Sequence, residues 1–138
     1  MYLSETNPKP LDSFDPVKVS RIALETFEKI IEAWGIKPSE AMTLLGFDES
    51  TRSTYYKWKR KPETVKLSKE KLERLSYIFG IYKALQILLP NNNSADEWIK
   101  KPNDGPLFNG DSALNRMLSG HVADLYVVRR YLDAQRGW

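Results

Sequence analysis

The residue types best suited to chemistry in this chain are the cationic and polar side chains between residues 52 and 61. Guanidinium and ammonium groups neutralise phosphates, and side chains with donors or acceptors can read base edges in the major groove of DNA. The candidate DNA-contacting residues are Arg52, Ser53, Tyr56, Lys57, Lys59, Arg60 and Lys61. The first four are expected to reach base edges, and the last three phosphates, which fix position rather than sequence. For Tyr56, simple packing on the protein surface is an equally open alternative.

These side chains stand in the pattern of a helix-turn-helix. Residues 38–45 predict a short apolar helix, Gly46 can adopt the left-handed conformation that a sharp turn requires, and a second helix then carries the cationic cluster until Pro62 stops it. Tyr55 and Trp58 share one face of the second helix and are predicted to anchor it in the core. In such a motif the first helix crosses the phosphate backbone and the second enters the major groove.

The second helix also opens a strongly basic segment. From Arg52 to Arg74 the sequence has nine basic and three acidic residues, so this segment carries a net charge of +6 in a chain whose total is +3. A solvated helix face is the ordinary explanation of such a run. Its position at the end of a helix-turn-helix favours phosphate neutralisation instead.

The composition excludes several other kinds of chemistry. The 138 residues include no cysteine, which rules out disulfides, thiolate metal sites and a cysteine nucleophile. The single histidine, His121, follows Gly120 without a partner motif, and we predict a capping or surface position for it. Carboxylate pairs such as Asp48-Glu49 stand where helices are expected to begin, and the helix macrodipole explains them there. We therefore expect no enzymatic activity, no metal site and no cofactor.

The chain also lacks the apolar segments that membranes and secretion require. No apolar run approaches the ~18 residues of a membrane helix. The N-terminal sequence has neither the basic start nor the apolar stretch of a secretory signal. We expect no membrane association and a cytoplasmic location.

Helical periodicity runs through the sequence, and no segment demands a strand, which predicts an all-α fold. Asp15-Pro16 predicts an N-cap followed by proline at the first helical position, and Gly35 predicts the end of that helix. Ser68 predicts the start of a long helix that ends near Leu89. Residues 1–14 have two prolines and no periodicity and are expected to form a flexible arm. The first helix is expected to bury Val19, Ile22, Ala23, Phe27, Ile30, Ile31 and Trp34.

The C-terminal part predicts a smaller helical unit. Residues 94–97 form a capping box that predicts the start of a short helix. A turn-rich loop follows over residues 102–110, and Asp111 is expected to cap the next helix. On physical grounds alone this is a helical hairpin, with Trp98 and Phe108 as core residues.

Short motifs follow one another in a distinctive order along this part of the chain. They are Trp98, Pro102-Asn103, Phe108, Gly110, Leu114 and Leu118-x-Gly120, followed by a valine-rich helix near the C-terminus. This order resembles the toxin-binding domain of the Xre/MbcA/ParS antitoxin family. The segments 44–47 and 54–58 are similar to the Xre-like helix-turn-helix of that family, so that the resemblance spans roughly residues 15–135. The sequence departs from the family at Tyr55, where an aliphatic residue is usual.

The resemblance implies an Xre-like helix-turn-helix bundle followed by a small helical toxin-binding domain. We expect the helix-turn-helix region over residues 15–67, a connecting and dimerisation helix with its loop over 68–93, and the toxin-binding domain over 94–138. The implied function is that of a type II antitoxin. Such a protein binds a RES-type toxin near the active site of that toxin, and the toxin degrades NAD or transfers ADP-ribose. The resemblance also implies a homodimer that represses its own operon by binding operator DNA. The expected toxin-contacting residues are Asn103, Phe108, Tyr131, Gln135, Arg136 and Trp138.

Two mechanistic hypotheses follow from particular side chains. Arg136 is a bidentate donor and Trp138 a large anchor of the type enriched at binding hot spots, so the tail is expected to plug the entrance of the toxin active site. The alternative is a frayed end packed on its own helix. Ile78, Ile81 and Ile87 lie outside the main stripe of the long helix and are candidate dimer contacts, although burial within one copy explains them equally well.

A different class of function stays open from the sequence. The alternative is a stand-alone helix-turn-helix transcriptional regulator with an unidentified partner. An adaptor that keeps the helices without binding DNA is a further possibility. A neighbouring gene that encodes a RES-type toxin would separate the antitoxin from the stand-alone regulator, and a flat gel-shift result with intact toxin rescue would select the adaptor.

Overall fold

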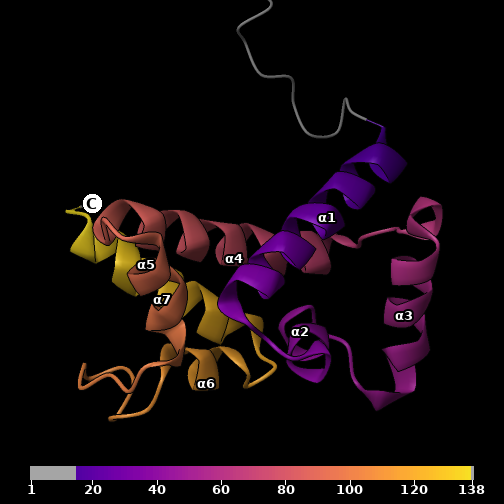
Figure 1. The fold of residues 1–138 in the computed structure, drawn as a ribbon. Coiled ribbons are helices and arrows are strands. Elements are labelled where there is room, and N and C mark those ends of the chain that lie inside the picture. Colours follow the sequence, from indigo (N-terminus) through magenta and orange to yellow (C-terminus); the bar gives the residue numbers. More distant parts are fainter. Residues whose placement is uncertain (1–14, 138) are drawn as a thin grey trace, which may run out of the picture.

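A computed structural model describes residues 15–137, and all regular structure in that range is helical (Figure 1). The α-helices are α1 (Pro16–Trp34), α2 (Pro38–Leu44), α3 (Arg52–Arg60), α4 (Lys69–Leu88), α5 (Asn92–Glu97), α6 (Ala113–Met117) and α7 (Val122–Gln135). Short 3₁₀ turns join them, namely η3 (Glu49–Thr51), η4 (Pro62–Thr64) and η5 (Trp98–Lys100). The all-α prediction is confirmed. The predicted arm, residues 1–14, and Trp138 lie outside the described residues.

α1 begins and ends where its terminal residues predict. The Asp15 carboxylate accepts a hydrogen bond from the Val17 amide at 3.0 Å, and Gly35 takes a left-handed φ of 64° directly after the helix. The predicted apolar stripe is wrong at Ile22, whose side chain is 52% exposed. Ser20 is buried instead, because its hydroxyl accepts a hydrogen bond from the Leu67 amide at 3.1 Å. Ile22 lies two residues further on and so points to the other side of the helix.

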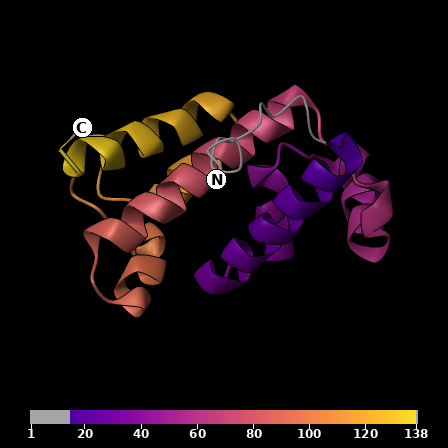
Figure 2. The same ribbon diagram turned by 90° about the horizontal axis from the view of Figure 1, so that it is seen from above.

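α4 is the central helix of the molecule, and α1 and α7 pack against it from different sides (Figure 2). For this reason it buries residues outside the stripe that the sequence predicts. Ile78 and Ile81 are fully buried within the single chain and cannot serve as dimer contacts. Of the three proposed isoleucines, only Ile87 is exposed.

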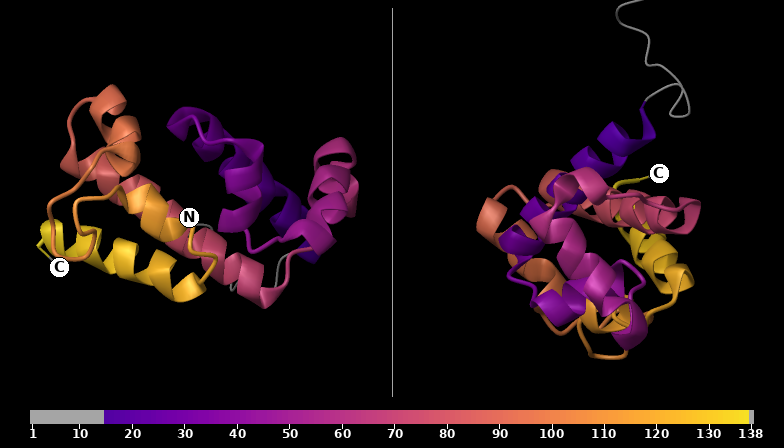
Figure 3. Two further views of the ribbon diagram at one scale, coloured as in Figure 1. Left: turned by 90° about the horizontal axis from the view of Figure 1, so that it is seen from below. Right: turned by 90° about the vertical axis from the view of Figure 1, so that its right-hand side faces the viewer.

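α7 runs parallel to α4. Gly120, just before α7, contacts Arg74 near the start of α4. Further along both helices Tyr126 contacts Tyr77, and Arg129 lies over Gly80. The chain can return in this way because α5, α6 and the loop between them carry it back along the molecule. As a result α3 and the C-terminal end of α7 lie at opposite ends of the molecule (Figures 1 and 3).

The N-cap residues of α5 and α6 differ from the predicted ones. α5 is capped by Asn91, whose side-chain oxygen accepts from the Asn93 amide at 2.8 Å, rather than beginning with the capping box at 94–97. α6 is capped by Ser112 instead of Asp111. In both places several short polar residues stand side by side, and the one whose backbone is extended directly before the first helical turn takes the cap.

Candidate functional site

Aromatic packing fixes α3 against the rest of the helix-turn-helix. Tyr55 is fully buried and Trp58 nearly so, and the ring of Phe47 lies 5.7 Å from the first and 5.3 Å from the second. The Tyr55 hydroxyl donates a hydrogen bond to Glu28 Oε1 on α1 at 3.1 Å. Burial, together with the Glu28 carboxylate, raises the pKa of Tyr55 well above its ordinary value. The prediction that Tyr55 and Trp58 are core residues is confirmed.

The opposite face of α3 is polar and open to solvent. Ser53, Lys57 and Arg60 are exposed there, as the helical period requires for residues facing away from Tyr55 and Trp58. The exposed candidates are Arg52, Ser53, Lys57, Lys59, Arg60 and Lys61.

Three candidates have neighbours that constrain them. Tyr56 is half-buried and packs edge-on against Tyr55, and the Arg52 guanidinium lies 5.5 Å from the Tyr56 ring. Lys59 lies towards α1, with its ammonium 5.5 Å from the ring centre of Tyr55. The open polar surface of α3 is therefore centred on Ser53, Lys57 and Arg60, with Arg52 beside them.

The start of the second helix carries negative charge. Asp48 accepts hydrogen bonds from the Ser50 hydroxyl at 2.6 Å and from the Thr51 hydroxyl at 3.0 Å, and these bonds hold the pKa of Asp48 below its ordinary value. Glu49 lies 3.7 Å from Arg52 in an exposed ion pair. Carboxylates thus occupy this helix end, whereas the basic side chains gather along the side and the C-terminal end of α3.

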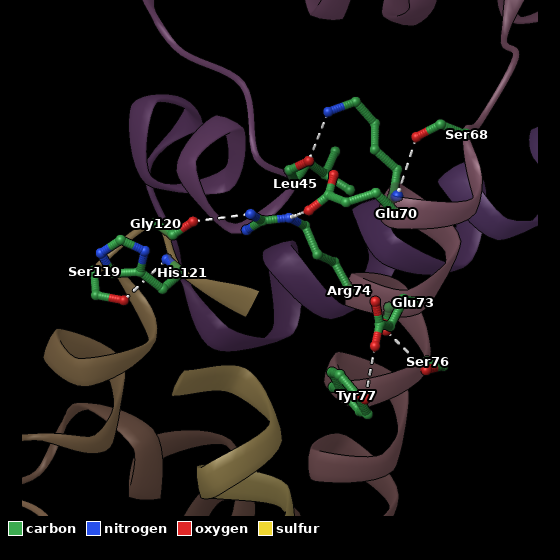
Figure 4. Close-up of polar contacts among 11 residues, drawn as sticks. Leu45, Ser68, Glu70, Glu73, Arg74, Ser76, Tyr77, Ser119, Gly120 and His121 are labelled. Carbon is green, nitrogen blue, oxygen red and sulfur yellow. Dashed lines mark hydrogen bonds and ion pairs between the residues drawn. The ribbon is translucent and has the colours of Figure 1, made fainter. Parts of the chain in front are cut away.

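Two members of the basic segment are partly or fully buried against the protein itself. The Lys71 ammonium donates to the Leu45 carbonyl at 2.9 Å and lies 4.1 Å from the Phe47 ring, and partial burial lowers its pKa. Arg74 is 8% exposed, pairs with Glu70 and donates to the Gly120 carbonyl at 2.8 Å (Figure 4). These two residues hold the turn of the helix-turn-helix rather than phosphates. The charge of the basic segment that is open to solvent therefore comes from its other members.

An aromatic cluster forms the centre of the C-terminal part. Phe108 is buried, and its ring lies edge-on to Tyr131 at 5.2 Å and to Trp98 at 6.1 Å. Trp98 and Tyr131 stack at 6.4 Å, and both are half-buried. The cluster joins η5, the following loop and α7. Phe108 therefore lies under the surface of the C-terminal part, whereas Trp98 and Tyr131 form part of that surface.

The loop over residues 102–111 is held in place by its own backbone. Asn103 donates to the Asp111 carbonyl and accepts from the Gly110 amide, both at 3.0 Å, and its side chain accepts from the Gly105 amide at 2.7 Å. A Cβ on Gly105 would lie 2.9 Å from that side-chain oxygen and 3.6 Å from the Tyr131 hydroxyl. The loop thus brings Asn103, Phe108 and Tyr131 together, as a common site would require.

Gln135 and Arg136 lie at the C-terminal end of α7, about one turn beyond Tyr131. Gln135 is exposed. The Arg136 side chain is 10% exposed and lies 3.8 Å from Asp133 on its own helix. Trp138 lies outside the described residues, so the proposed plug rests on the sequence.

Sequence reasoning missed the residues that brace the loop. Arg116 on α6 donates to the Leu107 carbonyl at 2.7 Å and to Asp124 on α7 at 3.0 Å. The Ser119 hydroxyl also donates to Asp124, at 2.6 Å, and these contacts hold the pKa of Asp124 below its ordinary value. Eight positions separate Arg116 from Asp124, a spacing with no helical meaning across a turn, so no sequence signal pointed to the pair.

The structure also bears on three features considered in the sequence, namely His121, possible metal ligands and possible membrane helices. His121 is exposed directly before α7, and its backbone amide donates to Ser119 Oγ at 3.1 Å. Among residues 15–137, no group of three or more potential metal ligands converges. Within the same range, every helix is too short or too polar to cross a bilayer.

Comparison with known proteins agrees with this two-part architecture. Residues 18–80 match the antitoxin Xre-like helix-turn-helix domain, and residues 84–137 match the antitoxin Xre/MbcA/ParS C-terminal toxin-binding domain. The chain is 47% identical over 114 residues to the uncharacterized protein y4oB of Sinorhizobium fredii (strain NBRC 101917 / NGR234), covering 83% of this chain and 84% of that protein.

A helix-turn-helix joined to a toxin-binding domain defines an antitoxin, a class of protein that is typically not enzymatic. The chain belongs to the Xre/MbcA/ParS antitoxin family. Its toxin-binding domain implies a cognate toxin partner.

Proposed function

We propose that this antitoxin neutralises a RES-type toxin, one that degrades NAD or transfers ADP-ribose, by direct contact near the active site. The single observation that carries the proposal is the braced loop at residues 102–111, which lies in the matched toxin-binding domain at the end of the molecule away from α3. A loop whose amides are already paired loses little conformational entropy on binding. We infer that Asn103 and Tyr131, with Phe108 beneath them, form the contact surface, and that Gln135, Arg136 and Trp138 extend it.

We also propose that a homodimer binds operator DNA through α3 and represses its own operon. One helix of this size makes too few contacts for tight specific binding, so two half-sites about 34–36 Å apart are expected. The separation of α3 from the 102–111 loop supports this part of the proposal, because DNA and toxin would then occupy different ends of one chain. For the dimer contact, Ile87 is the one proposed isoleucine that remains exposed.

The test of toxin neutralisation is rescue of growth and of cellular NAD by co-expression with the cognate RES-type toxin. Deleting residues 135–138 should abolish protection if the tail enters the active site, whereas full protection by the truncated protein would reject the plug. Lys101→Ala serves as a control, because Lys101 is exposed and forms only a surface ion pair with Glu97. Failure of the full chain to bind the toxin at all would reject the proposal.

The test of operator binding is a gel-shift titration with the upstream region of the operon between about 50 and 200 mM salt. Lys57→Ala should weaken binding at every salt concentration and reduce the slope of log affinity against log salt by about one. Lys101→Ala should leave the slope unchanged. Affinity that does not respond to salt would contradict phosphate-driven binding. If toxin rescue succeeds and no shift occurs, the chain is an adaptor that retains the helices without binding DNA.

A further inference from the structure

The turn of the helix-turn-helix rests on two side chains from α4. Lys71 binds the carbonyl of Leu45, at the end of α2, and Arg74 packs directly under Gly46. The fit under Gly46 is tight, since a Cβ there would lie 2.7 Å from Arg74 Nε. Arg74 is buried, so it cannot move away into solvent without giving up its contacts. The position of the turn therefore depends on where Arg74 is held.

Arg74 is held in part by the C-terminal domain. Its Nη2 donates to the Gly120 carbonyl in the short connection between α6 and α7 (Figure 4). Glu70, on the same helix, pairs with the Nε side of the guanidinium. Gly120 therefore supplies the one contact in this group that comes from the toxin-binding domain.

The same connection leads to the 102–111 loop through a short series of polar contacts. Ser119, next to Gly120, donates to Asp124 at 2.6 Å, and Asp124 accepts from Arg116 Nε at 3.0 Å. Arg116 Nη1 then donates to the Leu107 carbonyl within the loop at 2.7 Å. Leu107 is itself an exposed apolar residue of that loop. The peptide link from Ser119 to Gly120 and the packing of Arg74 under Gly46 complete the series from the loop to the turn before α3.

We propose that Arg74, Asp124 and Arg116 couple the conformation of the 102–111 loop to the turn that positions α3. If Leu107 moves, Arg116 and Asp124 follow, the connection at Gly120 shifts, and Arg74 presses on or withdraws from Gly46. Energetic coupling of this kind is carried by hydrogen-bond networks and rigid elements. The inference rests on the proposed function only in naming the two ligands, toxin at the loop and DNA at α3. By linkage, each ligand would then change the affinity for the other by the same factor.

The coupling is tested in the full free chain by amide hydrogen exchange. Arg116→Met removes the contact to the loop and lies away from the helix-turn-helix. We expect faster exchange at the loop amides of Phe108 and Gly110 and also, remotely, at the turn amides of Gly46 and Phe47, by roughly 2- to 30-fold. These amides are suitable reporters because each donates to a nearby carbonyl in the structure.

The reverse experiment and its control use two arginines of similar design. Arg74→Met should accelerate exchange at the loop amides as well as at the turn. Arg129→Met is the matched control, because Arg129 also lies over a glycine, Gly80, also donates to a backbone carbonyl and also joins α4 to α7, yet it lies outside the series. The control should leave the exchange at Gly46 and Phe47 unchanged relative to amides in α1.

The proposal is overturned if Arg116→Met affects only the loop, or if Arg129→Met accelerates exchange at the turn as much as Arg116→Met does. Should Arg74→Met fail to fold, Arg74→Lys, which keeps the charge but loses the fork of donors, provides the same comparison. Neither DNA nor toxin takes part in the measurement. Its failure is therefore distinguishable from a failure of the proposed function.

Discussion

Replacement of Gly46 by alanine should be the most damaging single-methyl change in the helix-turn-helix. Gly46 has a φ of 83°, and a Cβ would lie 2.7 Å from Nε and 2.9 Å from Cζ of Arg74. Left-handed backbone costs a non-glycine residue about 1–2 kcal/mol. Displacing a buried guanidinium from its hydrogen bonds costs about 1.5–3 kcal/mol more. We expect Gly46→Ala to lower the free energy of unfolding by about 2.5–5 kcal/mol.

Two other glycines separate these contributions. Gly110 has a φ of 79° with nothing within 4 Å of its Cβ position, so Gly110→Ala should lower stability by the backbone contribution alone, about 1–2 kcal/mol. Gly80 is helical, and its Cβ would lie 2.5 Å from Arg129. Because Arg129 is 36% exposed it can swing aside, and the gain in helix propensity of about 1 kcal/mol offsets the lost contact. Gly80→Ala should therefore stay within about 1 kcal/mol of the unsubstituted chain.

The assay is urea unfolding followed by far-ultraviolet circular dichroism, with the free energy extrapolated to water for all three variants. The reasoning is refuted if Gly46→Ala and Gly110→Ala are equally stable, since the contact with Arg74 would then contribute nothing. It is also refuted if Gly80→Ala is as unstable as Gly46→Ala. In that case burial of the arginine would not distinguish the two sites.

Three further outcomes follow from the same contacts. Phe108→Ala should lower the free energy of unfolding by about 3–5 kcal/mol, because the substitution removes the ring at the centre of the aromatic cluster. Urea unfolding measures this change, and a loss below about 1 kcal/mol would contradict a central packing role for Phe108. Tyr55→Phe should cost about 1 kcal/mol through the lost bond to Glu28. The pKa of Tyr55 is raised in the folded chain, so the contribution of Tyr55 to folding stability is present below the ordinary pKa of 10.0 and is lost as the pH rises above it. The variant should therefore show a shallower alkaline decline in melting temperature than the unsubstituted chain. The pKa of Asp124 is lowered by Ser119 and Arg116, so the contribution of Asp124 to folding stability is present above the ordinary pKa of 3.8 and is lost as the pH falls through the folded value. Asp124→Asn should therefore flatten the fall in melting temperature at acid pH. An unchanged acid decline would reject this.

Local signals were sufficient for much of the fold. Asp15, Gly35 and Ser68 act as helix boundaries in the structure as in the sequence, because caps and left-handed glycines depend on neighbouring residues. The pairing of Tyr55 with Trp58 on one helix face gave the anchored side of α3, and hence its solvent-facing side. The caps at Asn91 and Ser112 were misplaced because several residues nearby could do the same work.

The sequence by itself determined the helical class, the exposed cationic face of α3 and the family resemblance, since each depends on residue type and short spacing. Only the tertiary structure decided which charges and isoleucines face inward. From residue type alone, Arg74 counted toward a phosphate-binding segment and Ile78 was open between a dimer contact and the core, yet both are buried within the single chain. Because α1 and α7 pack on different sides of α4, the buried residues of α4 do not form a single stripe in its sequence. The series from Leu107 to Gly46 likewise joins residues far apart along the chain, and it exists because α7 lies parallel to α4.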